Sequence, residues 1–302
     1  MTIERQWIEI MKLEVPDAFS PVIPFVPEVG FIDAQIKLMF MPHENAWDVF
    51  MFKQFVLPVQ HMFRDGASKV ILAFDDYDNV PRAKSITQVC HQTYTLCLPK
   101  LIFCFCLVGR TNQTKRISRF TPLAFGAQDQ LPPFPPIPWP AAMGNRTFKA
   151  KVVELVVTRL ADRLMSPELI GKILLIDWRG SNAQQWTFGE DGPTMIDVPR
   201  APIGEADLKF RTAIMEGQSL AADAIDGDFV PIGLLTENPK VAVARLQIDG
   251  EVGVRAIEWV HIGILRDGMA RLCPLQVSMQ QTSFAACHQT VLLTFAEHVN
   301  SH

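Results

Sequence analysis

Acidic residues stand at the ends of predicted strands and at one predicted helix start, where their carboxylates could bind divalent cations. Hard cations such as Mg²⁺ prefer oxygen ligands and keep several waters. Two such ions about 3.5–4 Å apart can stabilise the attacking and the leaving oxygen of a phosphodiester. Clustered carboxylates repel one another unless a cation or a proton intervenes. The candidate metal ligands are Asp33, Asp75, Glu205, Asp207, Asp226 and Asp228.

Each of these acids also has an ordinary structural explanation. Asp33 alone is typical of a turn or a helix cap, and residues 75–79 are typical of a solvated turn. The acids of GEAD, residues 204–207, suit the positive end of a helix dipole. AIDGDF, residues 224–229, is compatible with a tight Asp-Gly turn. Their succession along the chain therefore favours a shared site more than any single acid does.

The elements that must position these acids alternate between strand and helix, which predicts an α/β fold. We expect a mostly parallel central sheet with helices on both faces, because this alternation builds βαβ units. The carboxyl ends of parallel strands converge on one crevice. The expected strands are residues 29–33, 69–74, 172–177, 219–225, 241–248 and 252–262. The expected helices are residues 46–63 with a kink at Pro58, 146–164, 204–216 and 284–298.

Taken in order, the acidic segments resemble the successive motifs of the flap endonuclease (XPG) family, which has a PIN-like fold. The segments are FIDA (31–34), AFDDYDNVPRAKS (73–85), GEAD (204–207) and DAIDGDFVPIG (223–233). The resemblance implies one PIN-like nuclease domain over residues 1–302 that holds two Mg²⁺ ions, with Mn²⁺ as a substitute. It places Asp33, Asp75, Glu205 and Asp207 at the first ion, and Asp226 and Asp228 at the second.

The same resemblance implies a nucleic-acid substrate, DNA rather than RNA, a role in DNA repair, and the nucleus rather than the cytoplasm. Basic residues after the second motif grip the scissile phosphate in this family, and Lys84 matches the first of them. The second should follow seven positions later, where His91 stands. If residues 89–113 are an insertion, Arg116 takes that place. We expect such an insertion, either a lineage-specific loop or a translated retained intron.

Two further segments depart from the family pattern. Residues 120–145 replace a helical arch and contain PPFPPIPWP, which predicts an extended loop. We expect a surface excursion there, with binding to a proline-reading protein partner as the alternative. After residues 284–298 the sequence shows no acid of the family's last motif and no helix-hairpin-helix module. We therefore expect a weakened second metal site. The chain is expected to be a truncated or mis-spliced product, or else a stripped-down nuclease that finds its substrate through a partner.

Composition limits the remaining classes. The chain has 302 residues, 48% of them hydrophobic and 20% charged, which suits a globular protein with a sizeable core. A formal charge of −4 argues against a general nucleic-acid coat. No apolar run reaches the roughly 18–20 residues of a spanning helix, so we expect an intracellular protein with no membrane partner. The six cysteines lack zinc-type spacing and are expected to be reduced thiols.

Two other functions stay open at this point. A catalytically weak PIN-like domain could serve as an interaction or scaffold protein, which the missing last acid and the negative charge favour. A different magnesium phosphohydrolase on a Rossmann-like sheet would need an Asp-x-Asp motif after the first strand. FIDAQI, residues 31–36, has one acid only.

Overall fold

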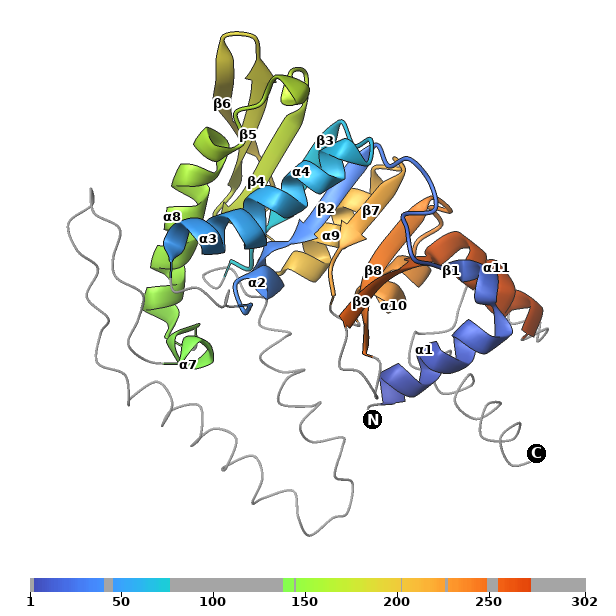
Figure 1. The fold of residues 1–302 in the computed structure, drawn as a ribbon. Helices are drawn as coiled ribbons and strands as arrows, with labels where there is room; N and C mark the ends of the chain where they lie inside the picture. Colours follow the sequence, from blue (N-terminus) through green and yellow to red (C-terminus); the bar gives the residue numbers. More distant parts are fainter. Residues whose placement is uncertain are drawn as a thin grey trace.

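A nine-stranded mixed sheet forms the centre of the molecule (Figure 1). The computed structural model describes residues 3–40, 46–76, 138–143, 145–201, 203–225, 228–248 and 255–272. Across the sheet the strands run in the order β1-β9-β8-β7-β2-β3-β4-β5-β6. Their bounds are β1 Phe19–Ser20, β2 Val29–Asp33, β3 Lys69–Ala73, β4 Ile173–Arg179, β5 Asn182–Gly189, β6 Gly192–Pro199, β7 Leu220–Asp223, β8 Val241–Ile248 and β9 Arg255–His261.

The central strands β8, β7, β2, β3 and β4 are parallel to one another. When these five strands are numbered in chain order and read across the sheet from β4 to β8, their order is 3-2-1-4-5. The direction of the order therefore reverses between β2 and β7. Every residue of β2 is buried, as expected for a parallel strand covered on both faces. In open α/β sheets, ligands bind beyond the carboxyl ends of the strands at such a reversal.

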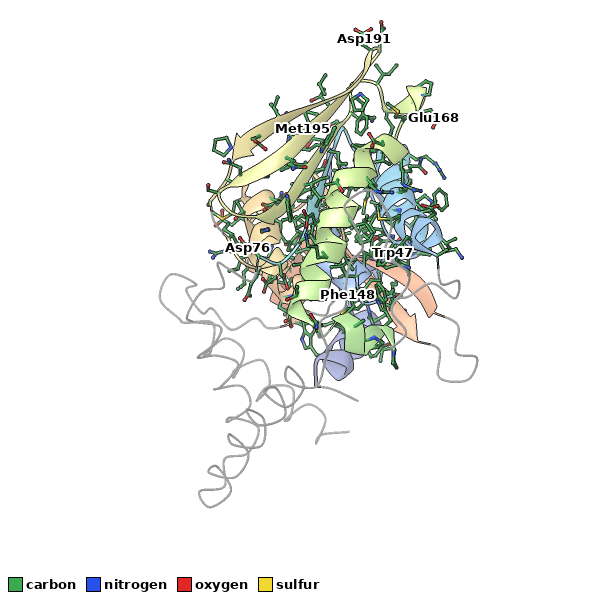
Figure 2. The ribbon with its side chains drawn as sticks, turned by 90° about the vertical axis from the view of Figure 1, so that its left-hand side faces the viewer. Trp47, Asp76, Phe148, Glu168, Asp191 and Met195 are labelled. Carbon is green, nitrogen blue, oxygen red and sulfur yellow. The ribbon has the colours of Figure 1, made fainter. Side chains whose placement is uncertain are left out.

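The outer strands correct the expectation of a mostly parallel sheet, because four pairings are antiparallel. The hairpin β5–β6 has a two-residue turn, Glu190 and Asp191, after which Gly192 adopts a φ of +108°. Such short connections can join only antiparallel strands. Figure 2 shows Asp191 at the free tip of this hairpin, far from Asp76. Neither hairpin strand was predicted from the sequence.

Helices cover both faces of the sheet, as predicted (Figure 1). On one face Ile32, Leu72 and Ile176 belong to a core with the first group of helices. On the other face Phe31, Ile71 and Leu175 belong to a core with the second group. The first group is α2 Ala34–Lys37, α3 Trp47–Met51, η2 Phe52–Val56, α4 Leu57–Arg64, α7 Trp139–Met143 and α8 Arg146–Arg163. The second is α1 Ile3–Glu14, α9 Ala206–Met215, α10 Phe229–Leu234 and α11 Ile262–Leu272, and the short turns η1 Pro16–Ala18 and η3 Pro167–Leu169 complete the elements.

The predicted helix at residues 46–63 is confirmed, and its irregularity lies at Pro58. The path is continuous through α3, η2 and α4, but η2 is a π-helical turn in which the Leu57 N–H bonds to the Phe52 carbonyl. Pro58 has no N–H to donate and would clash with the carbonyl four residues before it. A wider turn just before proline accommodates both effects.

Two predicted boundaries differ from the structure at helix starts. The end of the expected loop 120–145 is helical, since α7 spans Trp139–Met143. Pro140 is the second residue of that helix, where a missing N–H costs nothing. The strand expected at residues 252–262 ends at His261, and Ile262 begins α11. The predicted insertion 89–113, the remainder of the proline-rich segment before residue 138, and the predicted helix 284–298 lie outside the described residues.

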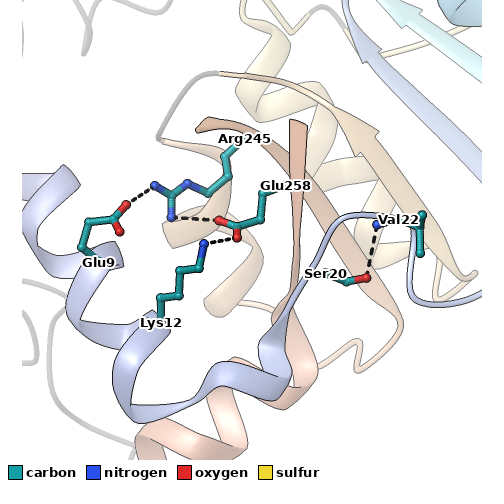
Figure 3. A network of polar contacts seen from close by, with 6 residues as sticks. All are labelled: Glu9, Lys12, Ser20, Val22, Arg245 and Glu258. Atoms are coloured by element: carbon teal, nitrogen blue, oxygen red, sulfur yellow. Dashed lines mark hydrogen bonds and ion pairs between the residues drawn. The ribbon is translucent and has the colours of Figure 1, made fainter. Parts of the chain in front are cut away.

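Ion pairs link α1, a helix that the sequence analysis did not predict, to the antiparallel strands β8 and β9 (Figure 3). Arg245 of β8 bridges Glu9 at 2.6 Å and Glu258 of β9 at 3.5 Å. Lys12 reaches the same Glu258, a buried carboxylate. These contacts stabilise the docking of α1 onto the face that carries α11. Within the described residues, no helix is long and apolar enough to cross a membrane.

Candidate metal centre at the carboxyl edge of the sheet

Asp33 is the last residue of β2 and lies at the edge where the parallel strands end. Its Oδ1 accepts hydrogen bonds from Gln35 N at 2.9 Å and Ile36 N at 3.2 Å. The side chain thereby caps α2, a contact worth about 1 kcal/mol in typical helices. It is 6% exposed. A carboxylate has two oxygens and about four lone-pair sites, so capping does not exhaust what Asp33 can bind.

Asp75 connects the second acidic motif with the third. Its Oδ1 accepts a hydrogen bond from Ala206 N at 3.1 Å, across 131 positions of sequence. The neighbouring Asp76 N donates to Gly204 O at 2.6 Å. Glu205 stands between these two anchor points and is buried, at 7% exposure. The GEAD segment is therefore held directly against the end of β3.

Asp76 has a structural task at this edge. Its Oδ2 accepts a hydrogen bond from Gly180 N at 2.8 Å, and the residue is buried. Gly180 adopts a φ of +71° in the turn after β4, a conformation that glycine tolerates without strain. Asp76 thus ties the turn after β4 to the segment after β3.

Lysines neutralise the acids that end β4 and β7. Lys209 of α9 pairs with Asp177 at 2.7 Å and also donates to Phe74 O at 2.8 Å. Lys37 of α2 pairs with Asp223 at 2.6 Å, with 9% and 14% of the two side chains exposed. The second pair joins α2, which directly follows β2, to β7, so it lies where the strand order reverses. Buried charges of this kind are tolerated only when they are paired.

Lys149 is a half-buried lysine in the first turn of α8. Burial lowers the pKa of Lys149, whereas the negative charges of Asp75 and Asp33 act in the opposite direction. Val152 and Val156, three and seven positions after Lys149, are fully buried. Because this spacing puts the three residues on one face of a helix, Lys149 lies on the face of α8 that packs against the core.

The structure brings part of the predicted acidic set together. Asp33, Asp75 and Glu205 come from separate segments to the carboxyl ends of β2 and β3. Asp207 is half-buried in the first turn of α9, and its Oδ1 accepts from Leu208 N at 2.8 Å. Asp228 is exposed and directly precedes α10. Asp226, Lys84 and Arg116 lie outside the described residues.

The donor chemistry of Asp33, Asp75 and Glu205 fits a hard cation, since all three offer carboxylate oxygens. Their geometry alone does not define a metal site: across the described ranges, no group of three or more His, Cys, Asp or Glu side chains is arranged to hold a metal ion.

Sequence reasoning missed the lysines of this edge. The sequence does contain a signal for Lys149. It stands at helical spacing before Val152, Val153 and Val156, so it is a charged residue on an otherwise apolar helix face. A lysine on an inward stripe needs a carboxylate partner or a water-filled crevice. Lys37 and Lys209 gave no such signal, since the acids that they pair with lie 186 and 32 positions away in the sequence.

No protein-family model matches this chain, and no curated protein matches it.

Proposed function

We propose that the protein is a magnesium-dependent nuclease with a PIN-like fold, related to the flap endonucleases, that hydrolyses phosphodiester bonds in DNA. The observation that carries the proposal is the meeting of distant acidic segments, in which Asp75 accepts a hydrogen bond from Ala206 N, beside Glu205. The order 3-2-1-4-5 of the parallel strands supports it, because it places these acids beside the reversal point where ligands bind.

In this proposal Asp33, Asp75 and Glu205 hold the cation, and helix caps fix the first two carboxylates in place. Mg²⁺ supplies Lewis-acid stabilisation of phosphate oxygens when bound. Asp207, Asp226 and Asp228 would complete the ligand set that the family resemblance implies. Lys84 and Arg116 would offset the charge of the scissile phosphate, as preorganised cations do for a transition state. A nuclear location follows from the same resemblance.

A non-catalytic scaffold is the second candidate, and a specific observation favours it. Lysines already neutralise Asp177 and Asp223. An acidic edge that is compensated by its own lysines has less need of a metal ion. Cleavage assays separate the two candidates.

The test is to incubate the purified chain with flapped, branched and single-stranded DNA and with RNA, in Mg²⁺, Mn²⁺ or EDTA. We expect metal-dependent cleavage of DNA that Asp33→Asn or Asp75→Asn lowers at least a hundredfold. Each asparagine keeps an oxygen for the helix N–H groups but removes the charge that holds the cation.

Asp197→Asn is the matched control, because Asp197 is an exposed acid of β6. It should retain full activity. Circular dichroism should show equal folding for all variants. If no substrate is cut in either metal, or if Asp33→Asn cuts as well as the parent, the nuclease proposal is wrong and the scaffold is favoured.

A further inference from the structure

Lys209 of α9 is a buried lysine whose ammonium group contacts the ends of two neighbouring strands. Only 4% of its side chain is exposed. Its Nζ lies 2.7 Å from Asp177 Oδ1, and it donates to Phe74 O at 2.8 Å and to Asp177 O at 3.2 Å. An ammonium has three N–H donors, so these oxygens can satisfy all of them. Lys209 therefore joins α9 to the residue after β3 and to a residue of β4.

The contact with Phe74 belongs to a larger junction between two segments of the chain. Three consecutive residues, 74–76, each bond the segment 204–209, which contains the acids of GEAD. Because the contacts run in opposite order along the two segments, the segments lie antiparallel at this junction. The contacts are Phe74 O with Lys209 Nζ at 2.8 Å, Asp75 Oδ1 with Ala206 N at 3.1 Å and Asp76 N with Gly204 O at 2.6 Å.

Apolar packing already holds α9 on the sheet. Phe210, the residue after Lys209, is fully buried and contacts Phe31 of β2, with ring centroids 5.3 Å apart. Such packing is non-directional, so it leaves the rotation of a helix about its own axis loosely defined. A buried ion pair can often be replaced by apolar residues without loss of stability. Directed hydrogen bonds from Lys209 instead fix how far α9 is turned toward the strand ends.

We propose that Lys209 is a positioning residue that fixes Glu205 and Asp207 relative to Asp75. This role is separate from neutralising Asp177. The inference rests on the proposed function, which it deepens by naming the residue that aligns two of the acidic segments. Lys209 N also donates to Glu205 O at 3.1 Å, so a turn of the helix links the ammonium contacts directly to Glu205. Catalysis is sensitive to such alignment, since a misplacement of about 1 Å can lower a rate about a hundredfold.

The test uses the double variant Lys209→Met/Asp177→Asn in the full chain. Removing Lys209 alone would leave the charge of Asp177 without its lysine, whereas the double variant removes both charges together. A purely stabilising pair would then be dispensable. If the double variant does not fold, Lys209→Gln replaces it, because its amide N–H can still donate to Asp177 while the contact with Phe74 is lost.

Two measurements are made on each protein. The first is the hydrogen-exchange rate of the Ala206 amide, which bonds to Asp75, and it needs no activity. We expect about tenfold faster exchange in the double variant, with unchanged exchange at Leu72 inside β3. The second is cleavage of the DNA that the parent cuts. We expect kcat to fall about a hundredfold while KM stays within about twofold, because alignment and not substrate binding is lost.

Lys69→Met is the matched control, because Lys69 of β3 pairs with Glu216 just after α9 at 3.5 Å. It removes a lysine contact between β3 and the other end of the same helix, and it should change neither measurement. Unchanged exchange at Ala206 in the double variant overturns the inference, and so does faster exchange with an unchanged kcat. If the parent cuts no substrate, the nuclease proposal is wrong, and the exchange rate alone decides whether Lys209 holds GEAD in place.

Discussion

At the scale of single residues, the acids at the carboxyl edge of the sheet differ in their hydrogen-bond partners. Some are paired with lysines, whereas Asp33 accepts hydrogen bonds from backbone N–H groups. Asp177 and Asp223 are bound by Lys209 and Lys37 at 2.7 and 2.6 Å, which makes them structural. Asp33 instead holds backbone N–H groups through one oxygen. The sequence could not show this division, because the Lys37–Asp223 pair joins residues 186 positions apart.

His261 is a second residue whose charge matters, at the start of α11. Its Nδ1 accepts a hydrogen bond from Ile264 N at 3.2 Å, which requires an unprotonated nitrogen. Burial lowers the pKa of His261, while its own backbone contact and Asp267 act in the opposite direction. The folded protein therefore resists protonation more than the unfolded chain, whose histidine titrates near about 6.5.

This predicts a pH dependence of stability with a defined sign. The stability that neutral His261 contributes is fully present above pH of about 6.5 and is lost as pH falls through the lower folded pKa. We expect a loss of about 1 kcal/mol, the usual value of a helix cap. Urea unfolding between acidic and neutral pH measures it. His261→Asn caps without titrating and should lose less stability, whereas an equal loss in both proteins would contradict the assignment.

At the scale of elements, β6 is an edge strand whose outer side is protected by proline. Among the described residues, β6 pairs with β5 alone. Arg200 N donates to Ser181 O just beyond the strand. The backbone N–H and C=O groups of the even-numbered residues of β6 therefore point toward β5. The backbone groups of the odd-numbered residues point away from β5. Two of these residues, Pro193 and Pro199, have no N–H. Proline at an exposed edge opposes pairing with another chain.

The double variant Pro193→Thr/Pro199→Thr restores two outward N–H groups and should promote self-association. Exposed Met195 and Ile196 on the same strand would add apolar contact. We expect at least a tenfold rise in the association constant, about 1.4 kcal/mol, measured by sedimentation equilibrium. Adding Met195→Lys to the double variant should reverse the effect, because a lysine at the edge blocks pairing. Identical sedimentation of parent and double variant would show that the prolines do not protect the edge.

At the scale of the whole molecule, the sequence predicted the centre of the fold better than its margins. The buried strands β2, β3 and β4 are continuous apolar runs, which is typical of parallel strands covered on both faces. The hairpin β5–β6 escaped prediction because its residues are largely polar or half-exposed, although Asp191-Gly192 at its turn is a common hairpin signal. The meeting of Asp75 with GEAD was expected only from strand order, whereas the position of Lys149 depends on tertiary contacts.

The central claim is that carboxylates from distant segments of one chain share a divalent cation. The most direct measurement is the anomalous scattering of Mn²⁺ in crystals soaked with that ion. We predict a peak that Asp33 and Asp75 both ligate, at about 2.1 Å as for Mg²⁺. A map with no Mn²⁺ between these two side chains at millimolar concentration, or with the ion bound only elsewhere, would contradict the claim.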